Sequence, residues 1–386
     1  MSTVSATPEA PGPETAPAPE VAAATAEGPF ALRTLVRDYF IPIETNNFWY
    51  ALGGVLAISL VFEVLTGFAL SLVYTPDADK AFGITSDLLA SGFWSIILNF
   101  HYWNAFLIFG LVVVHMVRVF VSGGYRQGKE GLWYVGVLLA ILAFAISLTG
   151  EGLHWDEVGF GVPWNISEFL NAIGLAGAFN YTTDALQQIP VATQKLSQLY
   201  AVHIALLPVG LLLAVGLHYY LIRVKGISLP FWVRPTGRKG PFTEHIRVWL
   251  IYSGIAVALV LLVAIFVHRD PGTAPQLLPS SPLFGTPDDP GGLGFQPTFP
   301  ISWTRGMNII VANLGQDPDI WGTVLGMVLM FGALVLIPFA DRIKATPQGW
   351  AAAFDMRKRG IAFALLGIFF LVLIMGMVAS AITGAG

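Results

Sequence analysis

The sequence predicts an all-α membrane protein with seven transmembrane helices, in which a four-helix bundle is followed by three further helices. Composition is the first observation behind this class, because 55% of the 386 residues are hydrophobic, 11% are charged and the mean hydropathy is +0.68. The second observation is a series of apolar stretches, each long enough to cross about 30 Å of hydrocarbon. The third is a matched pair of histidines in each of two of these stretches.

The apolar stretches place the expected spans near residues 48–74, 93–121, 132–149, 199–224, 248–267, 320–340 and 361–382. Residues 1–28 precede them and contain mainly Ala, Pro, Glu, Thr and Ser, which predicts a disordered tail without the regions of a signal peptide. Between Phe30 and Phe40, apolar residues at helical spacing predict a helix on the membrane surface or an ordinary lead-in helix.

The distribution of Lys and Arg predicts the orientation. Of the 20 basic residues, 16 fall on one side of the expected spans and 4 on the other. The positive-inside rule therefore places the N-terminus in the cytoplasm and the C-terminus outside. Two long loops, at 150–198 and 269–319, are then expected on the outer side, where loops of such length are often functional.

Histidines mark both ends of two apolar stretches, at His101 and His115 and again at His203 and His218. An ionisable residue inside a membrane span is costly and is a functional candidate by default. At about 100° per residue, the two members of a pair lie within about 40° and about 60° of each other and roughly 21 Å apart along the helix. Two such helices that face each other would form two stacked sites with one imidazole from either side.

Two imidazoles on opposite sides suit the axial ligation of haem iron, which favours electron transfer over O₂ binding. Zinc is disfavoured because the members of a pair are too far apart to share one tetrahedral site. A hydrogen-bonded packing role remains the alternative for any single histidine. The chain has no Cys, which excludes disulfides, an iron–sulfur cluster held by this chain and a thioether-linked haem.

Several short motifs carry a family resemblance, and they lie at 48–54, 63–68, 115–119, 122–125, 132–136, 148–150, 155–156 and 218–228. With these motifs the chain resembles the cytochrome b/b6 family, the membrane core of quinol:cytochrome c or plastocyanin oxidoreductases. It is most similar to the b6 type fused to its small partner, subunit IV. The resemblance implies a dihaem four-helix domain at 29–225, a linker at 226–241 and a subunit IV-like three-helix domain at 242–386.

The resemblance also implies roles for single residues. His101 and His203 would hold the low-potential b haem near the outer face, and His115 and His218 a second b haem near the cytoplasm. Residues beside the haems or the quinone would be Gly53, Gly67, Gly136, Gly150, Arg118 and Arg223. In these roles the glycines leave room for a macrocycle, Arg118 pairs with a propionate, and Arg223 meets quinone oxygens with Lys225 nearby. The alternatives are small-residue helix packing for the glycines and positive-inside anchoring for the arginines.

The sequence departs from the family pattern at several positions. Leu98 stands where the family has an Arg, His154 where it has a Pro, and Ala51 where plant and cyanobacterial forms attach an extra haem through Cys. The Pro-Glu-Trp-Tyr motif of the outer quinol site is replaced by the segment 298–304, which contains no acid. His154 and Glu151 are therefore the candidate proton acceptors, with Asp156 and Glu157 as neighbouring acids.

The leading interpretation is the cytochrome b subunit of a multisubunit quinol:cytochrome c oxidoreductase in the bacterial cytoplasmic membrane. Quinol would bind between the 150–170 segment and the Pro300–Trp303 region, and electrons would cross two b haems to a quinone site near the cytoplasm. The expected partners are a Rieske-type iron–sulfur subunit, a c-type cytochrome, lipid and a second copy in a dimeric complex, but no nucleic acid. The alternative, favoured by the missing Glu, is a dihaem electron-transfer subunit that uses quinone on one side without bifurcation. A transporter or a purely structural protein would leave the histidine pairs unexplained.

Overall fold

The computed structural model describes residues 39–126, 128–230, 232–267, 269–272, 302–315, 318–341 and 350–383. The predicted tail at 1–28, most of the Phe30–Phe40 segment and Pro300 lie outside these ranges. Phe40 begins a short strand, so at least this end of the expected lead-in helix is extended backbone. Elsewhere the described chain is dominated by long apolar helices, and the all-α membrane class is confirmed.

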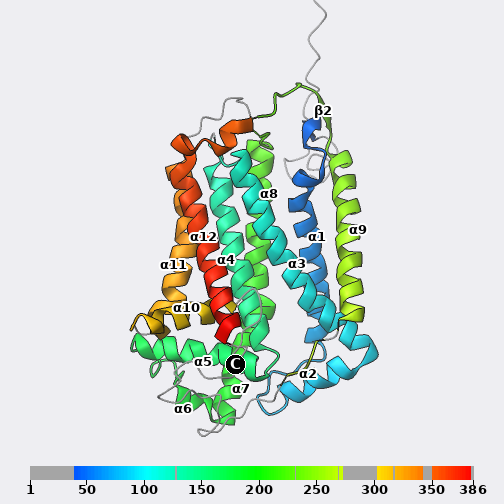
Figure 1. Cartoon of the computed structure of the whole chain (residues 1–386). Helices are drawn as coiled ribbons and strands as arrows, with labels where there is room; N and C mark the ends of the chain where they lie inside the picture. Colours follow the sequence, from blue (N-terminus) through cyan, green and yellow to red (C-terminus); the bar gives the residue numbers. More distant parts are fainter. Residues whose placement is uncertain are drawn as a thin grey trace, which may run out of the picture.

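Long helices stand side by side along one direction (Figure 1). They are α1 (Phe48–Ser71), α3 (Gly92–Ser122), α4 (Glu130–Gly152), α8 (Leu207–Lys225), α9 (Phe242–Phe266), α11 (Pro318–Ala340) and α12 (Met356–Thr383). Strands β1 (Phe40–Pro42) and β2 (Lys239–Pro241) pair antiparallel at one end, which we call the strand end. The opposite end, the loop end, carries the helices α2 (Ala81–Ala90), α5 (Glu157–Ala172) and α6 (Thr183–Leu186).

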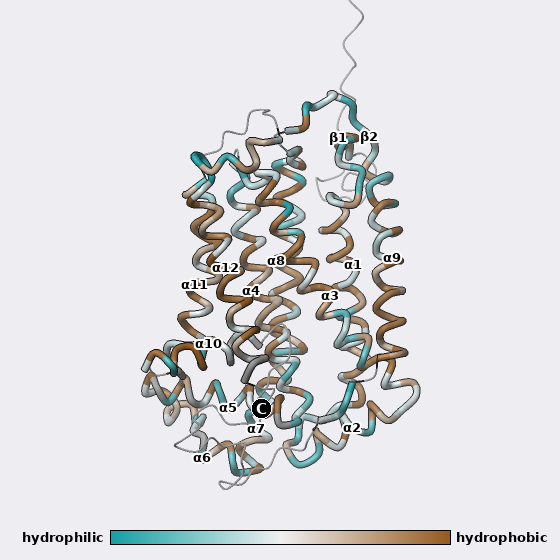
Figure 2. The backbone as a smooth tube through the Cα atoms, viewed as in Figure 1, coloured by the Kyte–Doolittle hydropathy of each residue, from teal (hydrophilic) through white to brown (hydrophobic). Residues whose placement is uncertain are grey.

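Six helical segments among the described residues are long and apolar enough to cross a membrane. They match six of the predicted spans, while α11 contributes a shorter apolar stretch, Val324–Ala340, at the position of the remaining one. Figure 2 shows hydrophobic residues along the middle of the helices and more hydrophilic ones towards both ends. The count of seven spans stays a prediction.

Local sequence signals set several helix ends. Asn47 caps α1 by accepting a hydrogen bond from the Trp49 N–H at 3.1 Å. Asp156 caps α5 in the same way, through the Gly159 N–H at 2.7 Å. Helix α3 ends at Gly123, whose φ of 65° lies in the left-handed region that glycine adopts without steric cost.

The fourth predicted span begins earlier than expected. Its helix starts with α7 (Ile189–Ala201), passes through a π-helical turn at Val202–Leu206 and continues as α8. Pro208 follows the π turn and has no N–H to donate to the preceding turn, a common cause of local irregularity in a helix. The predicted loop at 150–198 therefore contains α5, α6 and α7 rather than irregular chain alone.

The helices after residue 241 flank the first four on two sides. Helix α9 packs against α1 and α3, whereas α10 (Ser302–Asn313), α11 and α12 pack against one another, and α11 also contacts α4 and α5. Figure 1 shows α9 and α11 at opposite edges of the molecule. The division into a four-helix and a three-helix domain stays a prediction.

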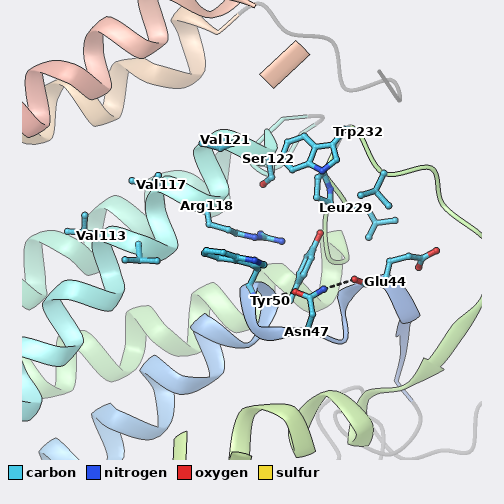
Figure 3. Close-up of a pocket in the computed structure, with 14 residues that line it drawn as sticks. Glu44, Asn47, Tyr50, Val113, Val117, Arg118, Val121, Ser122, Leu229 and Trp232 are labelled. Atoms are coloured by element: carbon cyan, nitrogen blue, oxygen red, sulfur yellow. Dashed lines mark hydrogen bonds between the residues drawn. The ribbon is translucent and has the colours of Figure 1, made fainter. Parts of the chain in front are cut away.

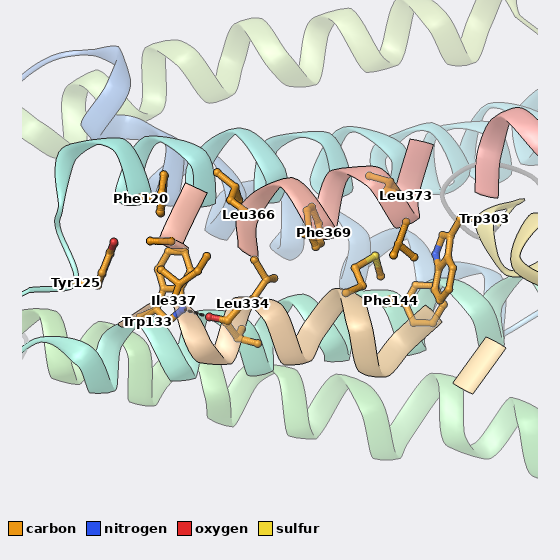
Figure 4. Close-up of a cluster of buried hydrophobic side chains, with 14 of the residues drawn as sticks. Phe120, Tyr125, Trp133, Phe144, Trp303, Leu334, Ile337, Leu366, Phe369 and Leu373 are labelled. Carbon is orange, nitrogen blue, oxygen red and sulfur yellow. Dashed lines mark hydrogen bonds between the residues drawn. The ribbon is translucent and has the colours of Figure 1, made fainter. Parts of the chain in front are cut away.

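A buried cluster joins α3 and α4 to α11 and α12 (Figure 4). One hydrogen bond in it has a clear backbone cause. Pro338 cannot donate to the Leu334 carbonyl four residues earlier, and the Trp133 Nε1–H donates to that carbonyl at 2.7 Å instead. Because a membrane offers no water to satisfy a freed carbonyl, this bond fixes α4 against α11.

Arg359 lies at the strand end of the same interface and is fully buried. Its guanidinium donates to the Asp341 carboxylate at 3.1 Å and to the Phe120 and Val121 carbonyls at 2.6 and 3.1 Å. The two carbonyls belong to the last turn of α3, where the carbonyls lack the usual helical N–H donor four residues later, and the Phe120 carbonyl also accepts from the Gly123 N–H at 3.1 Å. One buried cation thus ties α12 to the end of α3 and to α11.

Candidate functional site

The four histidines lie on α3 and on the helix formed by α7, the π turn and α8. His101 and His203 face each other with ring centroids 6.3 Å apart and ring planes at 78°. Two metal–nitrogen bonds of about 2 Å each would place the ligating nitrogens about 4 Å apart. The distance from nitrogen to ring centre adds about 1 Å on each side, so the two ring centroids would lie roughly 6 Å apart. The observed spacing therefore fits one metal atom held between these two imidazoles.

The second pair, His115 and His218, lies nearer the strand end, one residue on each of the same two helices. The two imidazoles are close enough to interact electrostatically. The Nδ1 atoms of both rings are buried and have no hydrogen-bond partner among the described residues. This pair thus repeats the first one along the helices, with a different environment at Nδ1.

The π turn explains how unequal spacings give equal geometry. The step from His101 to His115 is one residue shorter than the step from His203 to His218. A π turn takes up one extra residue, so the longer step behaves as the shorter one and its two rings return to within about 40°. A regular helix would separate the His203 and His218 side chains by about 60° around the helix axis, and the π turn at His203 reduces this angle.

A glycine lies directly behind each histidine ring. A Cβ added at Gly67 or Gly150 would lie 3.1 or 2.8 Å from the Cε1 of His101 or His203. At Gly53 and Gly136 the corresponding distances to the Cε1 of His115 and His218 are 3.6 and 3.9 Å. Helices α1 and α4 thus bring bare backbone up to all four imidazoles, which is the space that a flat macrocycle requires.

Matched threonines orient the pair near the loop end. The Nδ1 of His101 lies 3.0 Å from the Thr66 hydroxyl, and the Nδ1 of His203 lies 3.1 Å from the Thr149 hydroxyl. Each hydroxyl donates to carbonyls of its own helix and so can accept from an Nδ1–H. That tautomer leaves Nε2 free to bind a metal.

Sequence reasoning missed Glu63, which lies in the membrane-spanning part of α1 and reaches His101. Its Oε1 is 3.3 Å from the Nδ1 of His101, and its Oε2 accepts a hydrogen bond from Asn104 at 2.6 Å. The signal that could have found it is the acid itself, because a carboxylate within an apolar span is a functional candidate by default.

Arg118 lies at the strand end beside a pocket of about 680 Å³ (Figure 3). Its guanidinium stacks over the Tyr50 ring at 3.8 Å, and its Nη2 is buried with no hydrogen-bond partner among the described residues. Trp49, Val117 and Trp232 are among the residues that line the pocket. A buried donor of this kind at the edge of the His115–His218 pair is suited to an anionic group such as a propionate.

Arg223 lies at the same end of the molecule but on α8. Its guanidinium stacks over the Tyr39 ring at 3.6 Å, and Tyr39 in turn packs against Phe242 at the start of α9. Lys225, two residues further on, is exposed. Arg223 therefore lies where the last turn of α8 meets the residue just before β1, and Lys225 lies in the same turn.

The loop end gathers a group of charged side chains around Arg269, which the sequence identified only as one of the outer basic residues. Arg269 contacts His154, lies 3.7 Å from Glu151 and 3.6 Å from Asp156, and stacks over Tyr102 at 4.6 Å. Burial and the Arg269 guanidinium hold the pKa of His154 well below its usual 6.5. Burial raises the pKa of Asp156, and the Gly159 N–H partly opposes this rise.

Trp303, predicted to border the quinol pocket, is fully buried in the helix interface. Its ring lies 5.4 Å from that of Phe144 on α4, and its backbone lies directly against Gly376 of α12. The structure thus places this residue in the packing between α10, α12 and α4. The Ser302 side chain and Pro300 lie outside the described part of the chain.

The residues present fit a haem at both histidine pairs. The histidines, of which His101 and His203 face each other, would supply nitrogen ligands to the iron, the glycines beside all four rings would supply room, and the orphaned Arg118 donor would supply a partner for an anionic edge. This donor set has no Cys and offers two nitrogens per site, which suits b-type haem better than an iron–sulfur cluster or zinc.

Comparison with known proteins supports the same assignment. Residues 36–226 match the family described as Cytochrome b/b6/petB. The chain is 30% identical to cytochrome b6 from Prochlorococcus marinus (strain MIT 9515) over 197 residues, which are 50% of this chain and 89% of that protein. It is 31% identical to cytochrome b6 from Synechococcus sp. (strain JA-3-3Ab) over 197 residues, 50% of this chain and 88% of that protein.

A solved structure is similar over nearly the whole chain. It is described as a hyperthermophilic respiratory Complex III, and it aligns with a TM-score of 0.65 and 17% identity over 92% of this chain and 96% of its own. At that identity the likeness concerns the fold, and it extends beyond residue 226 to the last helices. From its sequence relatives and the facing histidine pairs, we conclude that the chain belongs to the cytochrome b/b6 family of haem-binding membrane proteins.

Proposed function

We propose that the chain is the membrane cytochrome b subunit of a bc-type quinol:cytochrome c oxidoreductase. One b haem would bind between His101 and His203 and a second between His115 and His218. The observation that carries this proposal is the pair of facing imidazoles at His101 and His203, together with a glycine beside the ring of each of the four histidines. When bound, the two haems supply one-electron carriers between the loop end and the strand end.

Quinol oxidation is proposed at the loop end, between the 150–170 segment and the Pro300–Trp303 region. Quinol releases protons on oxidation, so this end needs a base within hydrogen-bond reach. Glu151 and His154 are the candidates, and both side chains are buried beside Arg269. Because its pKa is lowered, His154 is neutral near pH 7 and can accept a proton, although it is a weaker base than a free histidine.

Quinone reduction is proposed at the strand end. Arg223 offers several N–H donors to quinone oxygens, and Lys225 adds a second positive charge nearby. Stacking on Tyr39 holds the Arg223 guanidinium in place from one face. Arg118 is proposed as the partner of a propionate at the His115–His218 site.

The placement in the cell and in a complex belongs to the same proposal. The basic residues at the strand end support a cytoplasmic location for that end in a bacterial inner membrane, with the C-terminus outside. We also propose residues 29–225 as the dihaem domain, 226–241 as a linker and 242–386 as a subunit IV-like domain. The partners would be a Rieske-type iron–sulfur subunit and a c-type cytochrome in a dimeric complex, since a chain without Cys holds no iron–sulfur cluster.

The test measures the haem spectrum of the purified complex, its subunit composition and the rate at which quinol reduces the cytochrome. We expect the purified complex to contain two low-spin b haems per chain, an iron–sulfur subunit and a c-type cytochrome. It should reduce the cytochrome with quinol, and both b haems should become reduced when the quinone-reducing end is blocked. A chain that binds no haem would refute the proposal.

A dihaem electron-transfer subunit of another complex is the second candidate. The segment 298–304 has no acid, and Trp303 is committed to helix packing, which favours a chain without a quinol-oxidising site at the loop end. An isolated complex with two b haems but no iron–sulfur subunit, which reacts with quinone at one end only, would select this alternative.

A further inference from the structure

Asp156 lies between α4 and α5, and its side chain is buried. One carboxylate oxygen, Oδ1, accepts the Gly159 N–H at 2.7 Å and so caps α5. The other, Oδ2, lies 3.6 Å from the Arg269 guanidinium. Capping alone does not require an acid, because Asn and Ser are equally good caps. The helix cap therefore leaves the ionisable group of Asp156 unexplained.

Two carboxyl groups share one cation at this junction. The same nitrogen of Arg269, Nη2, lies 3.7 Å from Glu151 Oε1 and 3.6 Å from Asp156 Oδ2. One guanidinium balances one carboxylate, and a second negative charge in a buried site is disfavoured by desolvation. In keeping with this, burial raises the pKa of Asp156 above its usual value. The arrangement therefore favours one proton held between the two carboxyls.

The two acids lie at different depths. Glu151 belongs to the last turn of the membrane-spanning helix α4, whereas Asp156 follows the end of that helix. Gly159 lies against both residues, because a Cβ added to it would be 2.8 Å from the Glu151 carbonyl oxygen and 3.3 Å from Asp156 Oδ1. Asp156 Oδ2 lies beside Gly272, which is exposed and has no side chain to cover it. Asp156 thus stands between the buried Glu151 and solvent at the loop end.

We propose that Asp156 is the proton relay of the loop end, which takes protons from the acceptors Glu151 and His154 and releases them to solvent. This relay presupposes the proposed quinol oxidation at the loop end and adds the route by which its protons leave. A proton leaves protonated Glu151 or His154, binds a carboxylate oxygen of Asp156 and then passes to water. No electron moves in these steps. Arg269 contacts all three side chains and stays charged throughout.

The experiment compares three variants of the purified complex. Asp156→Asn and Asp156→Ser keep a helix cap but remove the carboxyl, whereas Asp156→Glu keeps a carboxyl but is a poorer cap. We expect quinol oxidation at pH 7 to fall about ten- to a hundredfold in the Asn and Ser variants, and Asp156→Glu to recover part of the rate. The solvent deuterium isotope effect should rise in the Asn and Ser variants, because proton release then limits the rate. Thermal unfolding should rank the variants in the opposite order, with Asp156→Asn more stable than Asp156→Glu.

The pH profile of quinol oxidation is a second readout. Asp156 accepts a proton only while it is ionised, so it contributes above its pKa and not below it. The difference in rate between the wild type and Asp156→Asn should therefore shrink as the pH falls through that pKa. The other titratable side chains that meet Arg269 are Glu151, His154 and Tyr102, and all three are unchanged in these variants.

The controls separate the relay from the proposed function and from a structural role. Asp184→Asn removes an exposed acid of α6 at the same end and should leave the rate unchanged. A wild-type complex that does not oxidise quinol at the loop end refutes the proposed function, and the relay with it. An active wild type with an unchanged rate and pH profile in Asp156→Asn and Asp156→Ser overturns the relay alone. Rates that follow thermal stability across the three variants, or loss of the folded complex in both the Asn and Ser variants, would show a purely structural role and also overturn it.

Discussion

Replacement of Gly150 by Ala tests whether the glycines behind the histidines make room for haem. The added Cβ would lie 2.8 Å from the His203 Cε1, about 0.7 Å closer than the usual carbon–carbon contact of about 3.5 Å. Overpacking of this kind costs about 1–3 kcal/mol, and the better helix propensity of Ala returns up to about 1 kcal/mol. A net loss of about 1–2 kcal/mol corresponds to roughly five- to thirty-fold weaker haem retention at the loop-end site.

Gly136→Ala is the matched variant on the same helix. Its Cβ would lie 3.9 Å from the His218 Cε1, which is an ordinary contact, and we expect haem content close to wild type. The assay measures the haem-to-protein ratio, assigns the two haems by redox titration, and follows transfer of haem to an excess of apo-globin. Equal losses in the two variants, or a loss from the strand-end haem in Gly150→Ala, would refute the reasoning.

Three further variants test single roles. His203→Leu should remove one b haem and leave the other, and two low-spin haems in its spectrum would disprove the pairing. Arg223→Leu should slow the re-oxidation of the strand-end haem by quinone more than it slows the reduction of the haems by quinol. Equal effects on the two rates in stopped-flow measurements would point to a structural role. His154→Gln should lower quinol oxidation near neutral pH, where the lowered pKa keeps His154 neutral and able to accept a proton, and its rate should meet that of the wild type only well below pH 6.5, where His154 is protonated. An unchanged rate over the whole pH profile would direct attention to Glu151, for which Glu151→Gln is the matching variant.

The sequence alone determined the membrane class and the candidate ligands. Apolar stretches of span length and the histidine spacing are local properties of the chain, and helix geometry converts them into position and depth. The caps at Asn47 and Asp156 and the left-handed Gly123 are also local, since each depends on a few neighbouring residues. The family followed from motifs that are short but occur together.

Only the tertiary structure decided what lies behind and beside the ligands. Glu63 and His101 are far apart in sequence, and their contact depends on how α1 packs against α3. Arg269 meets His154 because the chain that leaves α9 returns over the end of α4. The π turn at His203 was equally hidden, because a regular 3.6-residue period gives no sign of one extra residue. Such contacts join segments whose approach is set by the packing of whole helices, and no local pattern in the sequence encodes that approach.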